Sequence, residues 1–403
     1  MKSESKRQKL WGGILLVAGT TIGAGMLAQP VVMGMVGYVP TLCLFTLFWL
    51  FMTFTAFLIL EANLWVGKGA NLISMAHATL GKWGEIVSWC AYLFLLYMLT
   101  TAYLAGCGPI LIAFIAMLTG IHLPLWGAIA PVLLLFGFVV FRGTSSVDHL
   151  NRVMMGGLAF AYVLLLAYLL PVIEVEQLQF ADWGSLYLTI GLVATSFGFH
   201  IVIPTLTEYL EGDVQLMRRA IWIGSLIPLG VYLLWETAAL GILPLEGSDG
   251  ILEGFRQGSN GAQMLATFLG HPLFSVFARL FAFFAILTSF LGVTLSLSDF
   301  LTDGLKIPHT AKGKLLVCLL TFIPPLIFVL TDARAFLNAL DYAGSFGVML
   351  LLGWIPIMMV WSGRYRQNRQ GAFVTPGGKG ALVLAKIFAL GVLLFVTVDK
   401  VVR

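Results

Sequence analysis

Long apolar runs separated by short polar clusters divide almost the whole chain. Most runs reach the ~20 residues that a helix needs to cross the hydrocarbon core of a bilayer. They are continuous and lack the two-residue alternation of membrane β-strands. The pattern therefore predicts an all-α polytopic membrane protein with eleven transmembrane helices, at residues 11–36, 40–62, 85–117, 124–141, 150–171, 185–210, 216–242, 272–301, 314–330, 334–361 and 382–399.

The ends of these runs carry further information. The first run follows a basic N-terminus and is too long for the core of a signal peptide, so we expect an uncleaved first helix. The longest connection, 243–271, contains a short amphipathic piece, Ala262–Leu269, and is expected to form an external hairpin. Most of the 23 Lys and Arg fall on one side of the predicted membrane. The positive-inside rule then predicts a cytoplasmic N-terminus and a periplasmic C-terminus.

Composition agrees with this assignment. Hydrophobic residues make up 59% of the chain and charged residues only 10%, against about 25% charged in soluble domains. The four cysteines lie in apolar stretches without paired spacing, so neither a disulfide framework nor a metal site is indicated. The net charge of +4 is explained by membrane topology, and we expect no nucleic-acid partner.

Two predicted helices are interrupted by glycine and proline. Residues 19–30 of the first helix read GTTIGAGMLAQP, and residues 194–204 of the sixth read ATSFGFHIVIP. Unwound backbone in a membrane costs several kcal/mol per unpaired group unless a cavity or ligand supplies partners. Two matched breaks therefore predict one shared binding site, although glycine and proline in a single span often serve only close packing or a kink.

The two breaks lie five spans apart, in the first and the sixth helix, so the chain crosses the membrane in opposite directions at the two places. This arrangement is typical of an inverted-repeat transporter, in which half-helix N-termini face an anionic group and free carbonyls hold a cation. We expect a five-plus-five inverted repeat with discontinuous helices 1 and 6. The first repeat would span 1–171 and the second 185–361, with an extra C-terminal helix and external terminus at 382–403.

The two interrupted motifs, together with residues 288–293 (TSFLGV), resemble the signatures of the hydroxy and aromatic amino acid permeases. That family includes the bacterial tyrosine-specific and tryptophan-specific permeases, and the resemblance covers nearly the full chain. It implies the fold of the amino acid, polyamine and organocation superfamily. It also implies uptake of an aromatic amino acid across the bacterial inner membrane by cation symport with alternating access.

The resemblance also implies a substrate site. The backbone of Gly23, Ala24 and Gly25 would bind the substrate carboxylate, since amides at the start of a half-helix bind anions. Carbonyls near four residues would take the ammonium, namely Thr20, Thr21, Phe197 and Gly198. The side chains expected to recognise an aromatic substrate or close its pocket are Phe197, Phe199, His200, Tyr97, Thr101, Phe284 and Phe346, each of which has plain helix packing as its alternative.

The coupling ion is either a proton or sodium, and no other cofactor is expected. In sodium-coupled relatives, a cation lies between first-helix carbonyls and a set of hydroxyls on helix 8. The matching positions here are Gly19, Ile22, Ala285, Thr288 and Ser289. The alternative is that the two hydroxyls bond back to their own helix carbonyls. Knowledge of the family favours the proton.

Ionisable residues inside a membrane are functional hypotheses by default. His200, in the second break, is a candidate to carry the coupled proton or to contact the substrate, with a neutral hydrogen-bonding role as the alternative. Glu236, Arg279 and Asp341 fall in the outer parts of their helices, where an arginine with two acidic neighbours is expected. Our hypothesis is that Arg279 or Gln29 holds Asp341 as an outer gate, with a purely structural salt bridge as the alternative.

Other function classes are disfavoured. No metal-binding or nucleophile motif is found in the spans, so an enzyme is not indicated. An antiparallel pair of breaks favours alternating access over a channel, whose filter usually surrounds one axis. A permease for another neutral amino acid, such as serine or threonine, remains the nearest alternative. The sequence does not rank tyrosine over tryptophan, and no obligate protein partner is implied.

Overall fold

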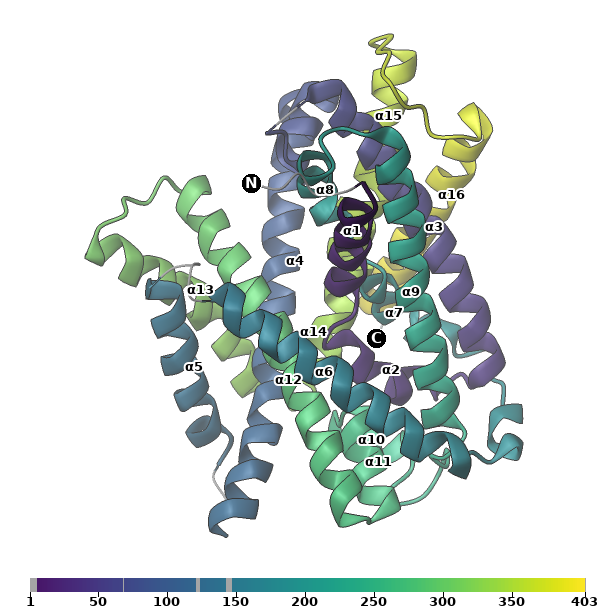
Figure 1. Cartoon of the computed structure of the whole chain (residues 1–403), viewed down its shortest axis with the longest axis vertical. Helices are drawn as coiled ribbons and strands as arrows, with labels where there is room; N and C mark the ends of the chain where they lie inside the picture. The colour runs from purple at the N-terminus through teal and green to yellow at the C-terminus, as the bar shows by residue number, and fades with distance from the viewer. Residues whose placement is uncertain (1–5, 68, 121–123, 143–146, 403) are drawn as a thin grey trace.

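The apolar runs fold as helices in the computed structural model, which describes residues 6–67, 69–120, 124–142 and 147–402 (Figure 1). No β-strand occurs within these ranges. The first half of the chain forms α1 (Lys6–Thr21), α2 (Gly25–Met33), α3 (Tyr38–Val66), α4 (Leu72–Thr119), α5 (Leu125–Arg142), α6 (Val147–Leu169), the short 3₁₀ turns η2 (Leu170–Val172), η3 (Val175–Gln179) and η4 (Leu186–Leu188), α7 (Ile190–Ser196), η5 (His200–Val202) and α8 (Ile203–Tyr209).

The second half is also helical, and it includes one π-helical stretch, η6. Such stretches are rare and occur frequently at functional sites. The elements are α9 (Val214–Leu240), α10 (Ile251–Gln257), α11 (Gly261–Leu269), α12 (Pro272–Gly304), α13 (Ala311–Thr331), α14 (Ala335–Tyr342), η6 (Ala343–Trp354), α15 (Ile355–Tyr365) and α16 (Gly378–Val402).

The all-helical membrane architecture predicted from the sequence is confirmed. In the described ranges, nine helices are long and apolar enough to cross a membrane, and the bent pair α1–α2 makes a tenth. The apolar part of α5, Trp126–Val139, is shorter. The count of eleven spans is therefore not confirmed, because it depends on whether this short helix crosses the bilayer.

The start of α4 differs from the prediction. The hydropathy pattern places the third span at 85–117, whereas helical structure begins at Leu72. Gly81, with φ of 74°, separates a short leading helix from the long apolar one. The leading helix begins with a capping box, in which Asn71 and Ser74 exchange side-chain and backbone hydrogen bonds. Hydropathy alone missed this segment because residues 72–80 are too few to read as a span.

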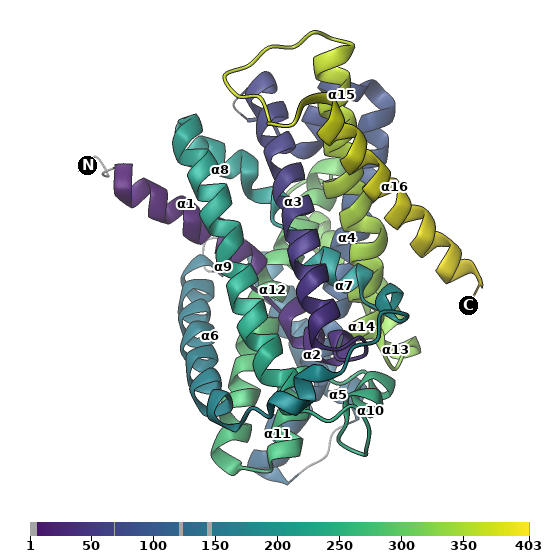
Figure 2. The same ribbon diagram turned by 90° about the vertical axis from the view of Figure 1, so that its right-hand side faces the viewer.

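The two breaks lie inside the bundle, where α2 and α7 are mostly buried. α1 packs along α9, and α7 packs against η6 and α2. α4 and α12 contact each other, and α5 and α13 lie together beside them at one edge (Figure 1). The N-terminal end of α1 and the C-terminal end of α16 leave the bundle on opposite sides (Figure 2).

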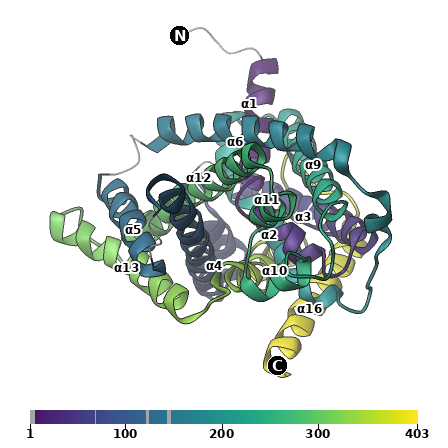
Figure 3. The same cartoon turned by 90° about the horizontal axis from the view of Figure 1, so that it is seen from below.

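The connection 243–271 forms the two short helices α10 and α11, which pack against α2. Seen from below, they lie at the centre of the molecule beneath α2 (Figure 3). The amphipathic piece predicted at Ala262–Leu269 is α11. These two helices therefore cover the end of the bundle at which the first interrupted helix finishes.

A buried ion pair fastens the opposite end. Glu61 on α3 is fully buried and accepts hydrogen bonds from Arg364 Nε at 2.7 Å and Arg364 Nη2 at 2.5 Å. The backbone N–H of Thr375 also donates to Glu61 at 2.8 Å, and Arg364 donates to the Thr375 carbonyl at 2.9 Å. Every hydrogen bond is charge-assisted. The cluster joins α3, α15 and the segment that leads to α16.

We expect Glu61→Ala to destabilise the protein by about 3–5 kcal/mol, because it leaves the Arg364 guanidinium without its carboxylate in a buried place. The measurement is thermal and denaturant unfolding in detergent. The matched control is Glu253→Ala, which removes the accessible Glu253–Arg256 pair at 3.6 Å and should change stability by at most ~1 kcal/mol. Equal unfolding of both variants would contradict the structural role of this cluster.

Candidate functional site

The first helix is broken in the middle of the bundle. α1 ends at Thr21, α2 begins at Gly25, and the two axes are bent by 53°. The second break lies between α7, which ends at Ser196, and α8, which begins at Ile203. Both interruptions fall at the glycine-containing motifs that predicted them. The discontinuous helices 1 and 6 are therefore present, with their broken segments inside the protein, where irregular backbone is tolerated in membranes.

One side chain joins the two breaks. The hydroxyl of Tyr232 on α9 contacts the carbonyl oxygen of Thr21 at 2.6 Å and that of Ser196 at 3.2 Å. These carbonyls end α1 and α7, so each lacks the helix partner that it would have in a continuous span. Tyr232 is itself 1% exposed. It therefore satisfies exposed backbone at both breaks and fixes their relative position.

Further bonds hold the short segments. The backbone N–H of Ala24 donates to Ser289 Oγ of α12 at 3.0 Å. Gln29 Nε2 on α2 donates to Ser196 Oγ at 3.0 Å, linking the two broken helices. Trp235 Nε1 donates to the carbonyl oxygen of Met26 at 2.9 Å. Each unwound stretch is thus held by side chains of neighbouring helices.

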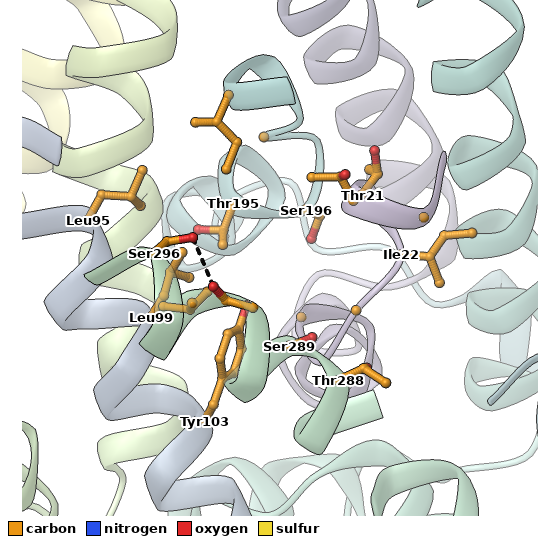
Figure 4. A pocket seen from close by; sticks show the side chains of 18 of the residues that line it. Thr21, Ile22, Leu95, Leu99, Tyr103, Thr195, Ser196, Thr288, Ser289 and Ser296 are labelled. Atoms are coloured by element: carbon orange, nitrogen blue, oxygen red, sulfur yellow. Dashed lines mark hydrogen bonds between the residues drawn. The ribbon is translucent and has the colours of Figure 1, made fainter. Parts of the chain in front are cut away.

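A cavity of about 320 Å³ lies at the breaks (Figure 4). Its volume falls at the lower end of the range of small-molecule sites. Its walls combine backbone of both breaks with hydroxyls and aliphatic side chains. The lining residues are Gly19, Thr20, Thr21, Ile22, Gly23, Gly25, Tyr92, Leu95, Leu96, Leu99, Tyr103, Asn151, Met155, Thr195, Ser196, Gly198, Ile201, Tyr232, Thr288, Ser289, Gly292, Val293, Ser296, Val348 and Leu352.

The cavity extends toward one end of the bundle. It extends toward the N-terminal ends of α4 and α6 and the C-terminal half of α12, and its lining includes the exposed residues Thr20 and Gly292. On the other side of the breaks, Met26, Trp235 and Phe281 are each 0% exposed. The rings of Trp235 and Phe281 pack with their centroids 5.2 Å apart. These side chains close that side of the molecule.

Most of the backbone positions expected at the site line this cavity. From the expected carboxylate and ammonium sites they are Thr20, Thr21, Gly23, Gly25 and Gly198, and from the expected cation site they are Gly19, Ile22, Thr288 and Ser289. Ala285 is fully buried beside it, and its carbonyl oxygen accepts from Ser289 Oγ at 2.9 Å. Thr288 Oγ1 donates to Phe284 O at 2.8 Å. Both hydroxyls thus bond back to their own helix.

The expected aromatic contacts lie elsewhere. Phe197 packs against Phe45, with ring centroids 5.8 Å apart, and Phe199 lies against His200. Tyr97 and Thr101 line a depression between α4 and α13, where the Tyr97 hydroxyl donates to Leu320 O at 2.9 Å.

Two further aromatic candidates also lie outside the cavity lining. Phe284 packs closely against Gly157 of α6, so that a Cβ on that glycine would meet its ring. Phe346 lines a separate apolar depression together with Phe94 and Tyr342. In this conformation all the expected aromatic candidates therefore serve packing between helices, and none of them lines the cavity.

The aromatic residues that do line the cavity are tyrosines that sequence reasoning missed. They are Tyr92 and Tyr103 on α4 and Tyr232 on α9. On α4 the lining positions 92, 95, 96, 99 and 103 follow the three-to-four spacing of one helix face. Tyr97 and Thr101 occupy a different face. Span three is apolar all round, so periodicity did not identify the inward face, although this tyrosine spacing was an available signal.

His200 is fully buried beside the second break. Its Nε2 lies 2.8 Å from Thr55 Oγ1, whose hydroxyl also lies 3.2 Å from the Met52 carbonyl oxygen. His200 is not part of the cavity lining. The observed geometry is that of a buried histidine that attaches the second break to α3.

The expected outer gate is wrong in its partners. Asp341 forms an ion pair with Lys400 of α16 and accepts from Ser345 Oγ at 3.2 Å, while Gln29 bonds Ser196. Glu236 has no hydrogen-bond partner among the described residues, so the predicted arginine with two acidic neighbours does not form. The prediction failed because Asp341 faces the extra C-terminal helix, whose position the sequence did not indicate. Arg279 lines a separate polar cavity of about 170 Å³.

Comparisons with known proteins identify relatives of the whole chain. The model of the tryptophan/tyrosine permease family matches residues 6–398. The chain is 32% identical to a tryptophan-specific transport protein of Pseudomonas aeruginosa over 96% of this chain and 94% of that protein. It is 34% identical to tyrosine-specific transport system 1 of Haemophilus influenzae, over 96% and 95%.

Two further matches broaden the picture. Glutamine transporter 2 of Aliivibrio fischeri is 31% identical, over 95% of this chain and 97% of that protein. Among solved structures, a manganese transporter mutant of Eremococcus coleocola superposes with a TM-score of 0.57 at 14% identity, covering 98% of this chain and 94% of that one. The structural match supports a transporter fold.

We expect Tyr232→Phe to lower the free energy of unfolding by about 1–3 kcal/mol, because two backbone carbonyls at the breaks lose their donor. Unfolding in detergent measures this change. Tyr168→Phe is the matched control, since Tyr168 is 40% exposed and contributes ring packing against Phe274. If both variants unfold together with the wild type, the Tyr232 bridge does not stabilise the breaks.

Proposed function

Because the chain belongs to the tryptophan/tyrosine permease family, we propose that it imports an aromatic amino acid by proton symport with alternating access. Its matched relatives are transport proteins and not enzymes. The observation that carries the proposal is the cavity at the two breaks, where backbone polar groups and apolar walls meet. This combination suits a zwitterion with a large apolar side chain.

The substrate's charged end would lie at the broken backbone. The N-terminus of α2, with Gly23 and Gly25 in the lining, offers amide groups and the positive end of a helix dipole to the carboxylate. Carbonyl oxygens at the ends of α1 and α7 would receive the ammonium. The Thr21 carbonyl stands opposite α2 and already accepts from Tyr232, which leaves its second lone pair for the substrate.

The aromatic side chain would lie between α4, α12 and η6. Leu95, Leu99 and Val348 supply aliphatic wall, and Tyr103 supplies an aromatic ring. Burying an aromatic side chain among such residues contributes about 1.5–3 kcal/mol. A short polar side chain would gain little of this free energy. The cavity therefore favours an aromatic substrate over serine or threonine.

We infer that this conformation faces the cytoplasm. The positive-inside rule assigns the exposed end of the cavity to the cytoplasmic side, and Trp235 and Phe281 close the opposite side. Transport would then require α1, α2 and the segments around the second break to rock against α4 and α12, which exposes the same site to the other side.

The residues support a proton better than sodium as the coupling ion. Thr288 and Ser289 both donate into their own helix, and Ser289 Oγ also accepts from the Ala24 amide. Less of their oxygen capacity is then left for sodium, which prefers several oxygen ligands. Sodium symport of the same substrates is the alternative. Transport of another neutral amino acid is a second alternative, which the glutamine-named relative keeps open.

Unlabelled tryptophan, tyrosine and phenylalanine should inhibit uptake of labelled tryptophan into proteoliposomes far better than serine or glutamine. Apolar burial of about 1.5–3 kcal/mol corresponds to a roughly ten- to hundredfold difference in the inhibitory concentration. Empty liposomes are the control. Equal inhibition by glutamine and tryptophan would contradict an aromatic-selective site.

An inward proton gradient should drive accumulation of labelled tryptophan in the absence of sodium, because the proton is the proposed coupling ion. The measurement imposes a pH gradient and a sodium gradient separately on the same proteoliposomes. A proton ionophore should abolish the accumulation. Accumulation driven by sodium at equal pH on both sides would replace this proposal with sodium symport.

A further inference from the structure

A carboxyl group without partners lies on the closed side of the site. Glu236 on α9 is 0% exposed, and neither of its carboxyl oxygens has a hydrogen-bond partner among the described residues. Burying an ionised carboxylate without a partner is strongly unfavourable, whereas a neutral carboxyl costs much less. In this conformation Glu236 is therefore more stable with a proton than without one.

The surroundings of Glu236 supply no compensating charge. Within the described residues, α1, α2, α3, α6 and the 3₁₀ turn η3 pack against α9. The acidic residue of η3, Glu176, is exposed. The nearby titratable groups from these helices and from α9 are hydroxyls with their own contacts. Tyr38 bonds Thr237, Tyr162 donates to Val231 O, and Tyr232 contacts the two breaks.

The charged groups of the same elements lie at other places or have other partners. Glu61 on α3 is paired with Arg364. Near the outer end of α9, the exposed Glu174 bonds the Gly241 carbonyl through its backbone N–H. At the opposite end of α9, the pairs are Lys6 with Asp213 and Lys9 with Glu211. No positive group among these residues pairs with Glu236, so a bound proton is what neutralises its carboxylate.

The position of Glu236 relates it to the closure of the site. Its neighbour Trp235 donates to Met26 O in the first break, and Tyr232, one helical turn earlier, lines the cavity. Gln29 on α2 is also 0% exposed, and its Oε1 has no hydrogen-bond partner in the described part of the chain. Polar atoms without hydrogen-bond partners, on α2 and α9, thus lie at the side that is closed in this conformation.

We propose that Glu236 is the proton-binding group of the symport cycle, and that its protonation permits the outer side to close. This inference rests on the proposed function. When the outer side opens, water reaches Glu236 and the carboxylate binds a proton from the periplasm. The neutral carboxyl is then buried as α2 and α9 come together. The proton later leaves to water in the cavity, which reaches Tyr232 one turn away.

The other candidates for this role differ from Glu236. His200 is hydrogen-bonded to Thr55 through Nε2, and although its Nδ1 also lacks a partner among the described residues, it lies at the second break and not on the closed side. Asp341 is paired with Lys400. Among the intramembrane groups that the sequence singled out, Glu236 combines complete burial, unpaired oxygens and a place one turn from the cavity.

Glu236→Gln tests the proposal, because the amide mimics the neutral carboxyl and cannot release a proton. Proteoliposomes would be assayed for exchange of labelled against unlabelled tryptophan and for accumulation driven by a pH gradient. We expect exchange within about twofold of wild type, independent of pH. Accumulation should fall from roughly tenfold, the limit for one proton and a tenfold gradient, to equilibration. Glu174→Gln, at an exposed position near the outer end of α9, is the control and should retain both activities.

The outcomes separate this inference from the proposed function. If wild-type protein fails to exchange tryptophan, the proposed function fails. If wild type exchanges tryptophan and Glu236→Gln still accumulates it under a pH gradient, Glu236 is not the proton-binding group. Loss of both exchange and accumulation in Glu236→Gln, in protein that elutes as a single folded species, would also overturn the proposal.

Infrared spectroscopy tests the protonation state without relying on transport. Wild-type protein with its outer side closed should show the carboxylic-acid C=O stretching band of a buried, protonated glutamate. This band should be missing from the difference spectrum of Glu236→Gln and present in that of Glu174→Gln. Its absence from wild type would overturn the proposal even if Glu236→Gln failed to fold.

Discussion

The structure depends on the need to satisfy backbone N–H and C=O groups where two helices are broken inside a membrane. In hydrocarbon each unpaired group costs several kcal/mol. The protein meets this need with side chains from neighbouring helices: Tyr232 contacts a carbonyl at each break, and Ser289 accepts an amide of the first. These contacts leave other polar backbone atoms facing the cavity, so one constraint creates both the fold's centre and its candidate binding site.

The bundle distributes its polar interactions unevenly around this centre. On the side of the exposed cavity lining, a buried ion pair with four hydrogen bonds fixes α3, α15 and the segment before α16. On the closed side, the interactions are weaker or incomplete, with single hydrogen bonds from Gln29 and Trp235 and an unpaired Glu236. Polar interactions therefore fix the side of the exposed cavity lining more firmly than the closed side.

The sequence predicted the parts of the site that depend on backbone and failed for the parts that depend on helix rotation. Glycine and proline located both breaks; at Gly23 a Cβ would lie 2.6 Å from Ser289 Oγ, so the close approach of α12 requires a residue without a side chain. The face of α4 that lines the cavity was missed, since a span that is apolar all round shows no periodicity. The sequence analysis therefore expected Tyr97 at the site, whereas Tyr103 lines the cavity and Tyr97 bonds Leu320 O. Ion pairs between residues far apart in the sequence, such as Asp341 with Lys400, could not be predicted from local sequence patterns either.

The double contact of Tyr232 also restricts how the chain can vary in length. A helix advances by ~100° per residue, so one inserted residue between the start of α9 and Tyr232 would turn the hydroxyl away from both breaks. During divergence, insertions and deletions between the start of α9 and Tyr232 should therefore be selected against.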